Sequence, residues 1–111
     1  MTRDDFRRIA LSLPETDETD DDGIVHFRIR GRAFARLPAR DFGWADVRLS
    51  RRDSELCGAG EPEIFAPLPS TWFHTGYTQI NLRKCGEHTL RSALAAAWRE
   101  VAPKRLAARL G

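Results

Sequence analysis

Hydrophobic residues recur at helical spacing over the first thirteen positions of the chain, which predicts an amphipathic helix with one buried side. The residues on this stripe are Phe6, Ile9, Ala10 and Leu13. Thr2 and Asp5 have the spacing of a capping box at the start of such a helix. Pro14 follows the stripe and is expected to end the helix, because proline removes a backbone donor.

Between residues 24 and 50 apolar and polar positions alternate, which indicates strands with one buried and one solvated face. The expected strands cover residues 24–30, 33–37 and 44–50. Their expected inward side chains include Val25, Phe27, Ile29, Ala45, Val47 and Leu49. We place the tight turn between the first two strands at Gly31 and Arg32, because glycine readily adopts a positive φ. These strands predict a three-stranded antiparallel meander.

After residue 50 the sequence again shows the features of a helix. Ser50 and Asp53 form a second capping pair, and Gly58 and Gly60 are expected to stop the short helix that follows. Residues 61–76 are irregular and proline-rich, and a fourth strand is expected over residues 77–82. A long helix is expected over residues 87–102, with one or two further turns after Pro103. Its buried stripe is Leu90, Leu94, Ala97, Trp98 and Val101.

Helices at both ends of an antiparallel sheet define the expected fold class, an α+β two-layer sandwich. We predict one domain over residues 1–111, with a sheet of about four or five strands and the N- and C-terminal helices packed on one face. No apolar run approaches the roughly 20 residues that a membrane span needs. Cys57 and Cys85 lack metal-type spacing and are interpreted as free thiols of a cytoplasmic protein.

Charge is distributed unevenly, although the net charge is only +2. Residues 1–22 hold eight acids and three arginines, a balance of −5. Residues 23–111 hold fifteen bases and eight acids, a balance of +7. Such a two-sided distribution favours an anionic partner for the basic part of the chain.

Five arginines in and after the first hairpin are candidates for a phosphate-binding edge. They are Arg28, Arg30, Arg32, Arg40 and Arg48. If they converge, each planar guanidinium could donate two parallel hydrogen bonds to a phosphate. About five such contacts would give nonspecific, salt-dependent binding to nucleic acid. The alternative is a solvated sheet face on which these arginines pair with Asp41, Asp46 and the acidic segment 15–22.

A second candidate site lies in the segment 64–77, which is rich in aromatic side chains. The candidates for a ligand pocket are Phe65, Trp72 and Tyr77, with Trp44 from the polar side of its strand. An exposed aromatic ring among arginines could stack on an unpaired base, a contact that contributes about 1–3 kcal/mol. The alternatives are a pocket for a small ligand or a protein, or rings that only cover the core.

Residues 15–22 carry six carboxylates and no apolar side chain, so a solvated acidic loop is expected. Hard cations prefer carboxylate oxygens, which makes weak metal binding by this segment a distant possibility, although the spacing is not that of a calcium-binding loop. No resident metal or cofactor is expected. Phosphate-binding loops and nucleophile motifs do not occur in the sequence, so an enzyme is not expected either.

Several stretches together resemble the MmcQ/YjbR family of small bacterial proteins over essentially the whole chain. They are LSLPET, HFRIRGRAFARL, GWADVRLS, PSTWFHTGYTQINL and LRSALAAAWREVAPKRL. The resemblance implies a frataxin-like (CyaY-like) α+β sandwich with two projecting sheet loops, the double wing, and a DNA-binding role. It implies no catalytic residues. We therefore expect a monomeric, non-enzymatic protein that binds DNA through the five arginines.

Overall fold

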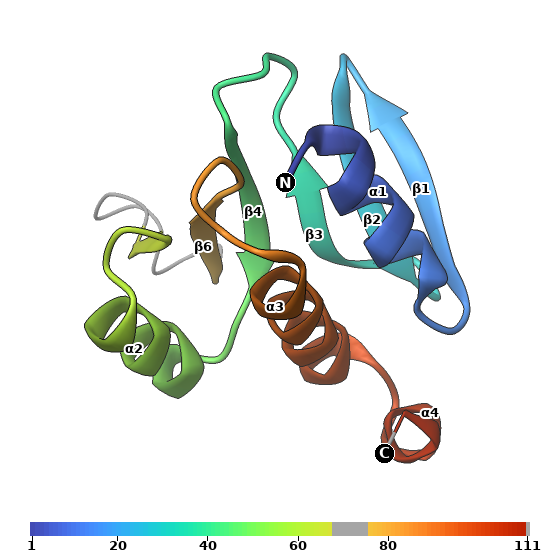
Figure 1. Cartoon of the computed structure of the whole chain (residues 1–111). Coiled ribbons are helices and arrows are strands. Elements are labelled where there is room, and N and C mark those ends of the chain that lie inside the picture. The colour runs from blue at the N-terminus through green and yellow to red at the C-terminus, as the bar shows by residue number, and fades with distance from the viewer. Residues whose placement is uncertain (68–75, 111) are drawn as a thin grey trace.

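The computed structural model describes residues 1–67 and 76–110, and contains four helices and six strands (Figure 1). The helices are α1 (Arg3–Ser12), α2 (Arg51–Gly60), α3 (Glu87–Val101) and α4 (Lys104–Arg109). The strands are β1 (Thr16–Asp21), β2 (Ile24–Ile29), β3 (Arg32–Leu37), β4 (Trp44–Arg48), β5 (Phe65–Pro67) and β6 (Tyr77–Asn81). The strands form one antiparallel sheet in the order β1-β2-β3-β4-β6-β5.

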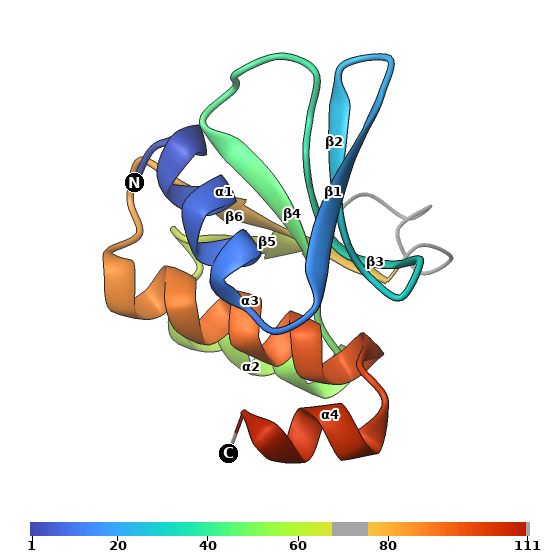
Figure 2. The ribbon, with the colours of Figure 1, turned by 90° about the vertical axis from the view of Figure 1, so that its right-hand side faces the viewer.

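The helices cover one face of the sheet, as Figure 2 shows, and the hydrophobic core lies between the two layers. Helix α3 packs on β3 and β4, α1 packs on β1 and α3, and α2 packs on β5. The largest fully buried side chains include Trp98, Phe6, Phe27 and Phe34. The predicted α+β two-layer sandwich is therefore confirmed, with six strands instead of four or five.

Capping residues set the helix starts that the sequence predicts. The Thr2 hydroxyl accepts a hydrogen bond from the Asp5 backbone N–H at 3.1 Å, and the Asp5 carboxylate accepts one from the Thr2 N–H at 2.8 Å. The Ser50 hydroxyl accepts from the Asp53 N–H at 3.0 Å at the start of α2. Each contact satisfies a backbone donor that has no partner within the helix.

The acidic segment is a strand, so the predicted loop over residues 15–22 is wrong. Strand β1 pairs along its whole length with β2 at one edge of the sheet. Aspartate and glutamate are poor strand formers, but here arginines from other elements neutralise them. The ion pairs are Arg7–Glu18, Arg28–Asp17 and Arg30–Glu15. Charged side chains on an edge strand also discourage pairing with another chain.

The first hairpin turns one residue earlier than predicted. Ile29 pairs with Arg32, so the two turn residues are Arg30 and Gly31. Both have a positive φ, +50° and +82°, which is the backbone of a type I′ turn. Arg32 consequently belongs to β3 and not to the turn.

The predicted inward residues Ala45 and Val47 of β4, and Leu49 directly after it, are all buried. Asp46, which was expected on the solvated face, is only 8% exposed and pairs with Arg36 on the sheet face opposite α1 and α3. Within the described part of the chain, no helix is long and apolar enough to cross a bilayer.

Candidate functional site

Two of the five candidate arginines are paired with carboxylates of the acidic segment 15–22. The register places Asp17 opposite Arg28, and the Arg28 Nε donates a hydrogen bond to the Asp17 Oδ1 at 3.1 Å. The Arg30 Nε donates to the Glu15 Oε1 at 3.1 Å. These are surface ion pairs, each worth little energy, but they place a carboxylate beside each guanidinium. A phosphate group would have to compete with that carboxylate.

Arg48 is engaged with its own sheet. Its Nε donates to the Ala33 carbonyl oxygen at 3.1 Å, and its guanidinium lies 4.5 Å from the centre of the Tyr77 ring. The guanidinium of Arg36 lies 4.2 Å from the same ring centre. Tyr77 is only 4% exposed, so its ring forms cation–π contacts within the protein and is not an open stacking platform.

Arg32 is the first residue of β3 and Arg40 lies beyond its last residue, so the five arginines do not share one end of the sheet. A strand of six residues is about 20 Å long, which separates the two side chains widely. This corrects the predicted convergence. Arg32 and Arg40 are close in sequence, but β3 separates them in space because it is an extended strand.

The two projecting sheet loops lie together at the end where Arg40 is found (Figure 1). They are the β1–β2 turn and the β3–β4 connection over residues 38–43. A Cβ added to Gly23 would lie 3.2 Å from the Cβ of Ala39, so the loops are in close contact. Asp21 at the end of β1 and Asp22 in the turn are exposed, and their charge would repel a phosphate backbone at this end.

The opposite end of the sheet is basic. Arg32 and Arg48 border a hollow of about 310 Å³ with Ala33 and Val101. The chain then continues from Val101 into α4, and residues 97–110 hold four bases and one acid. The exposed bases in this stretch are Arg99, Lys104, Arg105 and Arg109. Among the described residues, neither these four nor Arg32 has a carboxylate within ion-pair distance.

The predicted aromatic pocket is not assembled from the described members. Phe65 pairs with Ile80 on the helix-covered face and is 4% exposed. Trp44 is half-buried and pairs with Asn81, the next residue along β6, so it lies on the opposite face. Trp72 lies outside the described residues. Rings on opposite faces of one sheet cannot line the same pocket.

The acidic segment shows no metal site. Side chains of successive residues in β1 point to opposite faces, which separates the carboxylates that a cation would need together. In residues 1–67 and 76–110 no group of three or more His, Cys, Asp or Glu side chains could hold a metal ion.

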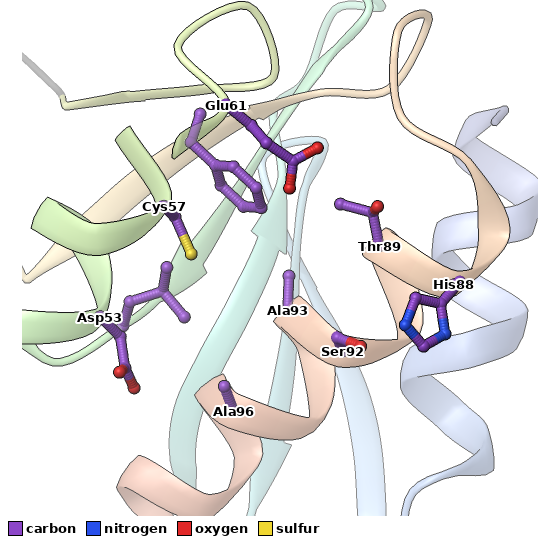
Figure 3. Close-up of a pocket in the computed structure, with 10 residues that line it drawn as sticks. Asp53, Cys57, Glu61, His88, Thr89, Ser92, Ala93 and Ala96 are labelled. Carbon is purple, nitrogen blue, oxygen red and sulfur yellow. The ribbon is translucent and has the colours of Figure 1, made fainter. Parts of the chain in front are cut away.

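A cleft that the sequence analysis did not anticipate lies between α2 and α3 (Figure 3). Its volume is about 310 Å³. One wall consists of Asp53, Cys57 and Glu61, four residues apart on successive turns of α2 and its end. This i, i+4, i+8 spacing was visible in the sequence, but the position of α3 opposite it was not.

Cys57 is the half-exposed thiol of this wall, whereas Cys85 is buried. Both cysteines are free, as expected. Partial burial raises the pKa of the Cys57 thiol, and the nearby carboxylates of Asp53 and Glu61 raise it further. Since the thiolate is the nucleophile, Cys57 is a weak one at neutral pH.

We expect iodoacetamide to alkylate Cys57 with a pH midpoint above that of free cysteine. Asp53→Asn removes one negative charge and should lower the thiol pKa, which speeds alkylation at pH 8 by about two- to threefold. Mass spectrometry of the labelled peptide measures the rate. Cys57→Ser is the control, because the remaining buried Cys85 should take up no label while the protein is folded. An unchanged rate in Asp53→Asn would contradict the electrostatic cause.

A scan against models of protein families gives no match, and a search among curated proteins gives none either. Among solved structures, the chain is similar to the crystal structure of Deinococcus radiodurans protein DR2400, described with the family-model domain DUF419. The TM-score is 0.76 at 20% identity, over 99% of this chain and 88% of that one. At this identity the likeness establishes the fold, a small α+β domain, and no activity.

Proposed function

We propose that this protein is a non-enzymatic DNA-binding protein that holds the phosphate backbone at the basic end of the sheet. The observation that carries the proposal is the hollow between Arg32 and Arg48, which adjoins a helix end rich in bases without carboxylate partners. This end differs from the arginine edge expected from the sequence, since Arg28 and Arg30 are paired with carboxylates and Arg40 lies past the other end of β3.

Arginine and lysine side chains at this end favour phosphate contacts that do not read the base sequence. The resemblance to the MmcQ/YjbR family supports DNA as the polyanion. Residence in the cytoplasm as a monomer belongs to the same proposal, and the two free cysteines fit a reducing compartment. The alternative site in residues 64–77 stays a prediction, because most of that segment lies outside the described residues.

The test compares two triple variants with the same loss of charge. In the first, Arg32, Lys104 and Arg105 are changed to alanine. We expect its affinity for a 20-base-pair duplex to fall at least tenfold at 50 mM salt. The slope of log affinity against log salt should become shallower by about 2–3, because each lost phosphate contact releases about one counterion fewer. Fluorescence anisotropy with a labelled duplex measures both quantities.

In the matched control, Arg52, Arg83 and Lys84 are changed to alanine, which removes three exposed cations from other parts of the molecule. This variant should keep most of its affinity and its salt slope. Equal losses in the two variants would mean that only net charge matters. Unchanged binding in the first variant would remove the basic end as the DNA site.

A further inference from the structure

The cleft between α2 and α3 has an apolar floor. Phe65 of β5 and Leu49, which follows β4, supply two of its side chains, and Ala93 and Ala96 supply the surface of α3. The short alanine side chains leave part of the space between α2 and α3 unfilled. Its volume of about 310 Å³ is at the lower end of the range for small-molecule sites.

The α2 wall is fixed in place by a buried polar contact. The Ser54 and Thr78 hydroxyl oxygens lie 2.7 Å apart, both residues are buried, and the hydrogen bond joins α2 to β6. The Ser50 cap fixes the start of the same helix. These two contacts hold α2 in position, which reduces the entropy cost of ordering the cleft when a ligand binds.

Two carboxylates lie on this wall without a cation beside them. Asp53 and Glu61 form no ion pair with any described residue, whereas Glu55 on the same helix pairs with Arg51. Eight residues separate them, which corresponds to about 12 Å along the helix axis. In Figure 3 the Glu61 carboxylate is directed into the cleft toward Thr89, and Asp53 lies at the other end of the wall.

We propose that this cleft binds a small aliphatic diamine, with its methylene chain on the apolar floor and its two ammonium groups at Glu61 and Asp53. A chain of about eight methylenes spans roughly the 12 Å that the helix sets between the two residues. The hydroxyls of Thr89 and Ser92 on the facing wall can accept further ammonium hydrogen bonds.

The chemistry of the cleft favours an organic cation over other ligands. An anion would meet two carboxylates, which repel it. A metal ion would need three or more ligands together, and no such group exists among the described side chains. A neutral chain could use the floor, but it would leave both carboxylates without a partner.

The test titrates the whole protein with 1,8-diaminooctane and follows backbone amide signals by NMR. We expect saturable shifts at Thr89, Ala93 and Cys57. Octylamine should bind at least fivefold more weakly, because it has one ammonium group. Octanedioate and 1,8-octanediol, which have the same chain with opposite or no charge, should give no saturable shifts at these residues.

Glu61→Gln and Asp53→Asn should each weaken the diamine at least fivefold, because each removes one ammonium partner. Glu55→Gln is the matched control, since Glu55 lies on α2 outside the cleft and pairs with Arg51. An equal loss of diamine affinity in this control would mean that the effect comes from general surface charge. Binding of the diol as tight as that of the diamine, or shifts located elsewhere, would overturn the proposal. DNA binding at the basic end of the sheet is not involved in either result.

Discussion

Replacing Trp98 by alanine is expected to lower the free energy of unfolding by about 3–5 kcal/mol, the largest effect of any single change considered for this protein. Trp98 is fully buried, and its ring lies in the core between α3 and the sheet. Its indole N–H also donates a hydrogen bond to the Pro14 carbonyl oxygen at 3.0 Å. The substitution therefore leaves a cavity and removes the shorter of the two hydrogen bonds to this oxygen, the other coming from the Thr16 hydroxyl at 3.5 Å. Urea unfolding followed by far-UV circular dichroism measures the loss.

Trp98→Phe separates the two contributions. It keeps most of the ring volume but removes the donor to Pro14, so a smaller loss of about 1–3 kcal/mol is expected. Phe42→Ala is the surface control, because Phe42 is 60% exposed and its removal should change stability by no more than about 0.5 kcal/mol. A loss in Trp98→Ala as small as that of the control would contradict the central position of this ring.

The burial of Trp98 could be predicted because it depends on local periodicity. The stripe of α3 repeats every three or four residues, and a helix that follows it must bury that side. The same holds for α1, where Phe6 and Ile9 are buried as expected. The starts of α1 and α2 could be predicted equally well, because the capping residues Thr2 and Ser50 bind partners only three residues away.

The strand β1 could not be predicted, because its stabilising partners are distant in sequence. Residues 15–22 hold six carboxylates and no apolar residue, a composition that predicts a loop. The arginines that neutralise three of them come from α1, β2 and the β2–β3 turn. Pairing of this kind depends on the sheet register, which composition does not contain.

The dependence on sheet register also explains why the five arginines do not form the single edge that the sequence predicts. An alternating strand pattern shows that Arg28 points away from the core, and it does. It does not show that Asp17 lies opposite, or that Arg32 and Arg40 lie at different ends of β3. Only the hollow between Arg32 and Arg48 preserves a part of the expected convergence, and the bases of α4 lie outside that prediction altogether.

The second large effect on the free energy of unfolding is expected from the ion pair of Arg36 and Asp46 on the open face of the sheet. These residues are paired in the register of β3 and β4, and the Arg36 Nε donates to the Asp46 Oδ2 at 2.6 Å. The Asp46 side chain is 11% exposed and that of Arg36 is 29% exposed. We expect Asp46→Ala to lower the free energy of unfolding by about 2–4 kcal/mol, because it leaves a half-buried guanidinium without its carboxylate.

A double-mutant cycle shows whether this loss comes from the stranded charge. Arg36→Met should cost about as much as Asp46→Ala, since it strands the carboxylate and removes the cation from the Tyr77 ring. The double variant should be less destabilised than the sum of the two single variants by at least about 1 kcal/mol, because no charge is then left without a partner. Additive losses in urea unfolding would contradict this coupling. Coupling as expected would identify Arg36 as a structural residue that holds Asp46 and Tyr77 in place, so the cations available to a polyanion would be those at the end of the sheet and not those on its open face.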